Sequence, residues 1–344
     1  MKIEQHTTVC FDSGWPVAAL RDTIAASHKA VLVAHTNADG DAVGSVTAML
    51  GILGKTGCKV TAMLPDGVPD DLSWLPRASY VLCGNADGDR CRTAIGEADL
   101  IVGLDICGFS RTGCLEQWLH GSTASKVLVD HHEEPETSSF NLMVSEPRAS
   151  STCELVYWLA TALYGRDALD RDTATSLYTG ICTDTGTFSY SNDRSSVYLA
   201  AANLLGYGID PMRINRQIRN TFTAARLRFF GFAMSERLIV DEGKGVALMT
   251  LTADDMRRHG VQSHELTGLV NEVMRLRSVD CAVLVREEDG RVRLSLRSKE
   301  RFDVNRMAAE LFGGGGHKRA AGATSTLTMA ETVQAVKEKL GIDA

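Results

Sequence analysis

Short apolar runs that lead into an acid or a histidine are the feature that most constrains the fold of this chain. Three of them, VLVA at 31–34, DLIVGLD at 99–105 and KVLVD at 126–130, have such a polar end. KVTAML at 59–64 is a fourth run without it. Continuous apolar strands of this length, separated by helical stretches, are typical of a parallel sheet covered on both faces. The sequence therefore predicts an α/β fold whose N-terminal domain is doubly wound around a mainly parallel sheet.

The pattern of the sequence changes after about residue 230. Alternating residues flank a glycine turn in LIVDEGKGVALMTL and flank Asp289-Gly290 in CAVLVREEDGRVRLSLRS, and both patterns indicate β-hairpins. Helices are expected at 152–163, 171–182, 195–220 (broken near Gly206–Pro211), 264–276 and 303–312. We therefore expect a smaller α+β domain with a mixed sheet at the C-terminal end. The expected division is an N-terminal domain at 1–195, a helical connector at 196–229 and a C-terminal domain at 230–344.

Composition excludes several classes of protein. The 344 residues carry a net charge of −7, which argues against tight binding to long nucleic acid. No apolar run reaches the roughly 18 residues of a membrane-spanning helix, and the first residues lack the pattern of a secretory signal. The nine cysteines include no C-x-x-C pair, so a disulfide framework or a thiolate zinc site is not expected. We expect a cytoplasmic monomer or homodimer without a membrane partner.

The first candidate site is the segment HTNADGDAVGS at 35–45, directly after a predicted buried strand. It carries His35, Asp39 and Asp41, and Gly40 between the carboxylates permits a tight turn that lets them converge. One imidazole and two carboxylates suit manganese or another divalent metal of similar hardness. The alternative is a polar loop in which Asp39 or Asp41 only caps the following helix. A calcium loop is disfavoured because its sixth-position glycine and twelfth-position glutamate are missing.

Three further clusters accompany this segment. Asp105 ends an apolar strand, Asp130-His131-His132 follows another, and Asp184 lies at the end of a predicted helix in GICTDTGTFSY. Each alone has an ordinary explanation as a helix cap or a satisfied loop residue. An acid and two imidazoles together, however, are costly to desolvate without a purpose. Because ligands bind at the carboxyl ends of the strands in doubly wound sheets, we expect the strand-end groups to form one site.

Taken together, the polar motifs resemble those of a known family. HTNADGDAVGS, GLDICGFSR, VDHHEEPE and GICTDTGTFSY resemble, in order and spacing, the four motifs of the DHH phosphoesterase superfamily. GGGGHKRAAG at 313–322 resembles the signature of the DHH-associated C-terminal domain. The resemblance covers nearly the whole chain and is strongest to the NrnA group of oligoribonucleases, which also dephosphorylate adenosine 3′,5′-bisphosphate. The chain departs from the family at Ala38, where proline is common, and in the acidic segment 133–135.

The resemblance implies two divalent metal ions in the N-terminal domain, expected to be manganese, with magnesium or cobalt as alternatives. Asp105 would bridge the two ions. The other ligands would be His35 and Asp39 for one ion, and Asp41, His131 and Asp184 for the second. Two such ions can lower the pKa of a shared water and stabilise charge on a phosphoryl group.

The resemblance also implies catalytic and orienting roles around the metals. Asp105, His131 and His132 would be the catalytic residues, with His132 facing the substrate phosphate. Asp130 would orient the imidazoles without binding a metal itself. Arg111, just after the second motif, is an alternative phosphate contact, although an ordinary surface arginine explains it nearly as well.

The C-terminal domain would bind the substrate. Glycine loops let backbone N–H groups approach phosphate oxygens closely, and arginine pairs well with phosphate. The residues implied in substrate binding are His132, Arg297, Ser298, Gly315, Gly316 and His317. Without the metal motifs, the glycine run would be interpreted as a flexible loop and Arg297 as an exposed strand residue.

The function implied by the resemblance is hydrolysis of short single-stranded RNA, or nanoRNA, to mononucleotides, and removal of the 3′-phosphate of adenosine 3′,5′-bisphosphate. The alternative is a phosphodiesterase for cyclic or linear di-adenylate. An exonuclease of the RecJ type is disfavoured because those chains are longer and carry an extra nucleic-acid-binding module. A family II pyrophosphatase lacks the glycine signature. A regulator with a decayed site is not supported, since all six proposed ligands are present.

Overall fold

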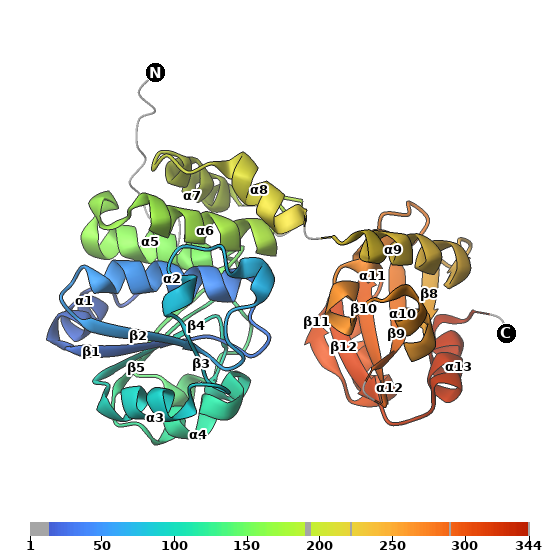
Figure 1. Cartoon of the computed structure of the whole chain (residues 1–344), viewed down its shortest axis with the longest axis horizontal. Coiled ribbons are helices and arrows are strands. Elements are labelled where there is room, and N and C mark those ends of the chain that lie inside the picture. Colours follow the sequence, from blue (N-terminus) through green and yellow to red (C-terminus); the bar gives the residue numbers. More distant parts are fainter. Residues whose placement is uncertain (1–13, 190–193, 221, 289, 343–344) are drawn as a thin grey trace. The chain divides into compact units, whose positions relative to one another are not determined.

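The chain forms two compact units, residues 1–221 and 222–344. The computed structural model describes residues 14–189, 194–220, 222–288 and 290–342, and Figure 1 shows the helices and strands of both units. The helical connector expected at 196–229 contributes to both units, because α7 (Ser195–Leu205) and α8 (Pro211–Arg219) fall in the first and α9 (Ala224–Glu236) in the second. A linker role for these helices stays a prediction.

The first unit is built on a six-stranded parallel sheet in the order β3-β2-β1-β4-β5-β6. Its strands are β1 (Lys29–Val33), β2 (Lys59–Leu64), β3 (Leu82–Cys83), β4 (Leu100–Leu104), β5 (Ser125–Asp130) and β6 (Leu142–Ser145). The apolar runs predicted as strands are confirmed as β1, β2, β4 and β5. The edge strands β3 and β6 were not predicted, because they are short and lack a continuous apolar run.

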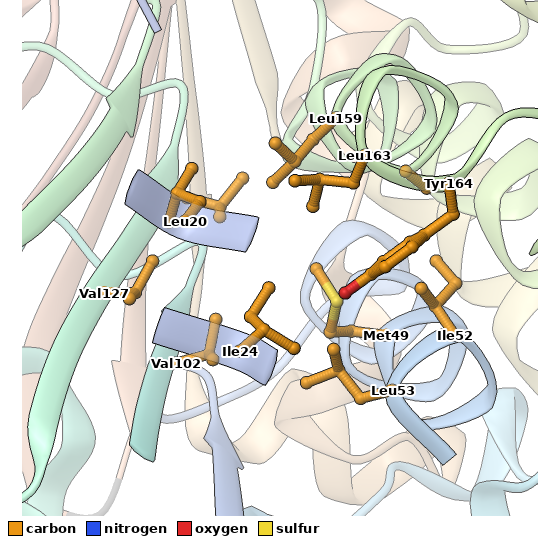
Figure 2. A pocket seen from close by; sticks show the side chains of 12 residues that line it. Leu20, Ile24, Met49, Ile52, Leu53, Val102, Val127, Leu159, Leu163 and Tyr164 are labelled. Carbon is orange, nitrogen blue, oxygen red and sulfur yellow. The ribbon is translucent and has the colours of Figure 1, made fainter. Parts of the chain in front are cut away.

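Helices cover both faces of this sheet (Figure 1). One face carries α1 (Val17–Ala26), α2 (Gly40–Gly54), α5 (Thr152–Tyr164) and α6 (Arg171–Asp184), and the other carries α3 (Gly88–Glu97) and α4 (Glu116–Gly121). Figure 2 shows an apolar cavity in the core of the first face, where Leu20, Met49 and Leu159 from three helices meet Val102 and Val127 of the sheet. Burial on both faces explains why every residue of β4 is apolar or glycine and buried.

Polar residues fix where the long helices begin. Asp39, Ser151 and Asp170 cap α2, α5 and α6, and each accepts backbone N–H groups of the first helical turn. Strands β1 and β4 are neighbours, but the chain leaves β1 towards β2 on one side and continues from β4 to β5 on the other. This change of direction opens a crevice at the carboxyl ends of β1 and β4, which is where doubly wound sheets bind their ligands.

The second unit has a six-stranded mixed sheet in the order β11-β12-β10-β9-β8-β7. Its strands are β7 (Leu238–Asp241), β8 (Val246–Leu251), β9 (Cys281–Glu288), β10 (Arg291–Ser298), β11 (Gly315–His317) and β12 (Ala320–Ser325). Only β8 and β9 are parallel. Both predicted hairpins are confirmed, and so is the mixed sheet.

The second sheet carries apolar side chains on both of its faces. Alternate residues of β9 divide between two cores: Val283 packs in one and Leu284 in the other. The first core includes α12 (Val304–Phe312) and α13 (Met329–Leu340), and the second includes α9, α10 (Ala253–His259) and α11 (Leu269–Val273). Among the described residues, no helix combines the length and apolar character needed to cross a membrane.

The predicted helix at 264–276 is wrong in its extent. A short 3-10 helix at Ser263–Leu266 and the five-residue α11 replace it, and Gly268 between them has a left-handed φ of 88°. That conformation interrupts a helix at little cost only for glycine. The glycine run at 313–316 is not a loop throughout, because Gly313 caps α12 and Gly315 begins β11.

We predict that Gly44→Ala destabilises the first unit, because a Cβ at this position in α2 would lie 2.7 Å from the Ser176 carbonyl oxygen of α6. The free energy of unfolding should fall by about 1–3 kcal/mol, as for overpacked cores. Gly54→Ala in the same helix is the control, since a Cβ there meets nothing within 4 Å. Chemical denaturation of both variants measures the difference, and equal stability would contradict the close packing of α2 on α6.

Candidate metal centre

His35 is the second residue after the end of β1, and a backbone carbonyl orients its ring. The Nδ1 atom lies 2.7 Å from the Thr36 carbonyl oxygen. Because a carbonyl only accepts, Nδ1 carries the hydrogen, and Nε2 is the ring atom that faces the carboxylates. It lies 3.4 Å from Asp105 Oδ2 and 3.9 Å from Asp39 Oδ1. Burial lowers the pKa of His35, but the hydrogen bond with Asp105 and the charges of Asp105 and Asp39 outweigh it and raise the pKa, so Nε2 would bind a metal ion by losing its proton.

Asp39 caps a helix, which is one of the two roles that the sequence left open, and it also lies close enough to His35 to be a candidate ligand. Its Oδ1 accepts the backbone N–H groups of Asp41 and Ala42, so it caps α2, and the same carboxylate faces His35. The predicted reason for Gly40 needs correction. Gly40 is the first residue of α2, not a left-handed turn residue, and a Cβ on it would collide with the side chain of Thr183. Glycine is required here by the close approach of α6.

Asp41 is fully buried and is held by the start of α5. The backbone N–H of Cys153 donates to its Oδ1 at 2.8 Å, and the N–H of Thr152 donates to its Oδ2 at 2.6 Å. Helix N-termini stabilise negative charge in this way. Burial nevertheless raises the pKa of Asp41 well above its ordinary value, and the charges of Asp105 and Asp39 raise it further.

Asp105 lies at the centre of the cluster. It follows β4 with a left-handed φ of 62°, a conformation that costs a residue with a side chain about 1–3 kcal/mol. Its Oδ2 faces His35, whereas its Oδ1 lies 3.6 Å from His131 Nε2 and accepts from the Thr152 hydroxyl at 3.1 Å. Burial alone would raise the pKa of Asp105, but the hydrogen bond with His35 and the nearby imidazoles hold it below its ordinary value.

His131 and Asp184 complete the other side of the cluster. The Nε2 atom of His131 lies 3.3 Å from Asp184 Oδ2 and 3.9 Å from Asp41 Oδ2. Its Nδ1 lies 3.4 Å from the Ala149 carbonyl oxygen. Asp184 is the last residue of α6, as predicted, and burial together with the charges of Asp41, Asp39 and Asp105 raises its pKa well above the ordinary value.

Among the described residues, four overlapping groups could hold a metal ion, and two of them match the predicted ligands. These two are His35, Asp39 and Asp105, and Asp41, His131 and Asp184; the other two both include His132. Within each group the ligand atoms lie within 4.8 Å of one another, and Asp105 also contacts His131 of the second group. Four carboxylates gathered so closely need cations to compensate their charge, and mixed imidazole and carboxylate groups suit divalent metals. The residues therefore fit metal binding.

Asp130 and Arg111 hold His132 between them. The Nδ1 atom of His132 lies 2.8 Å from Asp130 Oδ1, and its Nε2 lies 3.1 Å from Arg111 Nη1. Burial lowers the pKa of His132, but the Asp130 hydrogen bond and the surrounding charges outweigh it and raise the pKa to about 10. The ring with its hydrogen on Nδ1 satisfies both contacts, because Nδ1–H donates to Asp130 and the unprotonated Nε2 accepts from Arg111. A protonated Nε2, which the raised pKa favours, would instead need an acceptor such as an anion beside Arg111.

The candidate substrate residues of the second unit lie where β10, β12 and β11 pair. Arg297 is opposite Ala320, and Ala320 is in turn opposite His317, whose side chain is outside the described part. The Arg297 Nε donates to Asn271 Oδ1 at 3.0 Å. Ser298 is engaged differently: its hydroxyl donates to the Phe302 carbonyl oxygen at 2.9 Å and so holds the following turn.

The glycines of this region allow two strands to approach. Gly315 pairs with Gly322 of β12. Gly316 has a φ of 147°, and a Cβ on it would lie 2.5 Å from the Ala320 carbonyl oxygen. Gly316 is therefore needed for the pairing of β11 with β12, whatever else this segment binds.

Sequence reasoning missed the contribution of α5. Thr152 and Cys153 were interpreted only as the start of a helix, yet their backbone N–H groups hold Asp41, and the Thr152 hydroxyl holds Asp105. A signal was present. Ser151 followed by Glu154 before an apolar run marks a helix N-terminus, and such an end is a ready anion site.

Carboxylates gathered around imidazoles at the carboxyl edge of a doubly wound sheet are typical of metal-dependent hydrolases, and this is the class that the fold and the site define. Family models agree with it. The model of the DHH family, N-terminal domain, matches residues 29–181, and the model of the DHHA1 domain matches residues 243–341. The chain belongs to the DHH family of phosphoesterases and carries a DHHA1 domain as its second unit.

Individual relatives match almost the whole chain. The crystal structure of an exopolyphosphatase-related protein from Bacteroides fragilis superposes with a TM-score of 0.91 and 31% identity, covering 94% of this chain and 95% of that one. The probable bifunctional oligoribonuclease and PAP phosphatase NrnA of Streptococcus mutans is 28% identical over 85% of this chain and 87% of its own. The cyclic-di-AMP phosphodiesterase GdpP of Geobacillus thermodenitrificans is 27% identical over 94% of this chain but only 48% of its own length.

We predict that Asp184→Asn makes the metal-free protein less sensitive to a rise in pH above about 4. The raised pKa of Asp184 means that the folded protein holds a proton which the unfolded chain releases above about pH 4. Stability from this group is therefore present at low pH and is lost as the pH rises through the folded pKa. Asparagine has no such proton to lose. The slope of the free energy of unfolding against pH should therefore become shallower by up to about 1.4 kcal/mol per pH unit, the value for one proton.

Thermal unfolding in a chelator across this pH range provides the measurement, with the exposed Asp71→Asn as the control. Added manganese should stabilise the wild type and Asp71→Asn more than Asp184→Asn, because the variant has lost a candidate ligand. Parallel pH profiles for all three proteins would contradict the buried repulsion around Asp184.

Proposed function

We propose that this protein is a two-metal phosphoesterase that hydrolyses short oligoribonucleotides to mononucleotides and removes the 3′-phosphate of adenosine 3′,5′-bisphosphate. One observation carries the proposal: two groups of metal ligands share contacts with Asp105, and the Arg111–His132 pair lies beside them. The shared carboxylate supports two neighbouring ions, and the cationic pair supports a phosphate beside them.

Asp105 is proposed to hold both ions, His35 and Asp39 to complete one site, and Asp41, His131 and Asp184 to complete the other. When bound, divalent ions at such a pair supply a water of lowered pKa and stabilise charge on the phosphoryl group. Manganese is the proposed metal, with magnesium and cobalt as alternatives. The chain contributes preorganisation, since backbone carbonyls orient the rings of His35 and His131 and the start of α5 holds Asp41.

His132 and Arg111 are proposed to bind the phosphate that is attacked. Asp130 holds Nδ1 of His132, so Nε2 is the atom that faces Arg111 and the substrate. A protonated Nε2 and the guanidinium would both donate to phosphoryl oxygens. His132, or a water beside it, would then deliver a proton to the leaving 3′-oxygen. Asp130 acts through His132 and is a positioning residue.

Three features support a short nucleotide substrate. The probable oligoribonuclease and PAP phosphatase of Streptococcus mutans matches this chain over most of both lengths. The net charge of −7 disfavours long polyanions, which need many cationic contacts. The DHHA1 unit carries Arg297 beside the paired glycine strands, where it is proposed to bind a second part of the substrate together with Ser298, Gly315, Gly316 and His317.

A di-adenylate phosphodiesterase is the second candidate, favoured by the match of nearly the whole chain to part of a cyclic-di-AMP phosphodiesterase. The same two metals and the same cationic pair would serve that reaction. A cytoplasmic location and a monomeric or homodimeric state stay predictions.

Turnover of three substrates separates these candidates: a three-nucleotide RNA, adenosine 3′,5′-bisphosphate and cyclic di-AMP, each with manganese, magnesium or cobalt. We expect the first two to be hydrolysed fastest and manganese to support the highest rate. A long single-stranded RNA is the control. Comparable rates on that strand would contradict the short-substrate proposal, and faster cleavage of cyclic di-AMP would favour the second candidate.

Asp105→Ala should abolish hydrolysis of every substrate while the fold remains intact, because both ligand groups lose the carboxylate that connects them. The expected loss of kcat is at least about 1,000-fold, comparable to the removal of one essential catalytic group. Asp66→Ala is a control, since Asp66 lies on a neighbouring loop and contacts Asn37 and Asn85 outside the ligand groups. Near-full activity of Asp105→Ala with manganese would overturn the two-metal proposal.

A further inference from the structure

The second unit has a hollow on its sheet, further along β10 from the candidate substrate residue Arg297. Its volume is about 510 Å³, within the usual range for small-molecule sites. Strands β9, β10 and β12 and the end of α12 form its walls. The lining residues used below are Arg286, Arg293, Ser295, Gly314, Gly322 and Thr324.

Two arginines lie opposite each other in this hollow. Arg286 of β9 pairs directly with Arg293 of β10, and like charges in that position destabilise a sheet. Glu288 compensates only in part, with its Oε2 3.3 Å from Arg286 and 2.7 Å from Arg293. These three side chains carry one net positive charge. The repulsion between the two opposed arginines lowers the stability of the sheet. A net positive charge that remains in a hollow despite this cost indicates an anionic ligand.

Arg286 is also incompletely paired. One of its terminal nitrogens donates to the Ser295 hydroxyl at 3.2 Å and the other faces Glu288. Its Nε is buried and has no hydrogen-bond partner among the described residues. Arg293, by contrast, is half exposed at its side chain and accessible to a ligand. The pair therefore combines a largely buried arginine with a half-exposed one.

Small residues give the hollow its depth. Gly322 and Thr324 of β12 lie opposite Ser295 and Arg293 in the sheet register, so β12 adds no large side chain here, whereas Phe312 adds an aromatic side chain to the lining. A Cβ on Gly314 would collide with the Gly322 carbonyl oxygen, so this position of the wall is free of a side chain. Glycine backbone and two arginines therefore contribute to the lining, as they do in other phosphate sites.

We propose that this hollow is a second phosphate subsite, which binds the backbone of an oligoribonucleotide beyond the nucleotide held near Arg297. The inference rests on the proposed function. One face of β10 carries every second residue, and these include Arg293, Ser295 and Arg297. The two arginines are therefore four positions apart, which corresponds to about 13 Å along the strand. A short RNA spans that distance, whereas the two phosphates of one nucleoside bisphosphate do not.

The subsite therefore distinguishes the two proposed substrates. Arg293→Ala should raise KM for a five-nucleotide RNA about five- to tenfold and leave kcat unchanged, as expected for the loss of one charge-assisted contact away from the reacting atoms. KM for adenosine 3′,5′-bisphosphate should not change. The slope of log KM for the RNA against log salt should fall by about 0.7, the value for one phosphate contact on a single strand.

Two further variants make the test specific. Thr324→Asp adds a negative charge to the hollow without removing a member of the ion network, and it should raise KM for the RNA alone even if Arg293→Ala folds poorly. Arg291→Ala is the matched control, because Arg291 lies on the same face of β10 but outside the lining. Thermal unfolding of the full chain checks that each variant is folded.

The outcomes separate the subsite from the function on which it rests. A wild-type protein that leaves both substrates uncut contradicts the proposed function itself. If the wild type cleaves them, three results overturn the subsite alone: unchanged KM for the RNA in Arg293→Ala and Thr324→Asp, an equal rise for adenosine 3′,5′-bisphosphate, or an equal rise in the Arg291→Ala control.

Discussion

Electrostatic repulsion among the carboxylates of four aspartates is the constraint that the rest of the first unit has to satisfy. Asp41 and Asp105 are closed off from water, and Asp39 and Asp184 lie against them. Burying one carboxylate is costly, and burying several together is costlier still. The protein offsets part of this with the amide groups at the start of α5 and with His35 and His131, but the pKa values of Asp41 and Asp184 still rise. Divalent cations are the compensation that fits the remaining charge.

The parallel sheet makes this concentration of charge possible. Strands β1, β4 and β5 end at one edge, and each delivers its polar residue there without a long loop. Helices α2, α5 and α6 then close over the edge because glycines let them approach. A Cβ on Gly180 would lie 2.8 Å from Asp41 Oδ1, and one on Gly40 would collide with Thr183. The same small residues that bring the helices together therefore bring Asp184 to Asp41.

The second unit uses its sheet in a different way. Strands β8 and β9 contribute apolar side chains to the cores on both faces. Strands β10 and β12 contribute to the first core on one face, and on the other face they carry arginines and small residues. A sheet face of this kind can bind an extended polyanion along a strand, because alternate side chains recur at a regular spacing.

The sequence by itself determined the class of fold and the members of the candidate site. Apolar runs of strand length that alternate with helical stretches favour a covered parallel sheet, and the residues that end such strands meet at one edge. For this reason β1, β4 and β5, and the convergence of His35, Asp105 and His131, were predictable. Tertiary structure alone decided what holds these groups. The contacts of Thr152 with Asp41 and Asp105, the left-handed backbone of Asp105, and the packing reason for Gly40 join segments far apart in the chain or depend on local strain. Local sequence patterns record periodicity and turn preference, whereas these contacts depend on how helices pack in three dimensions.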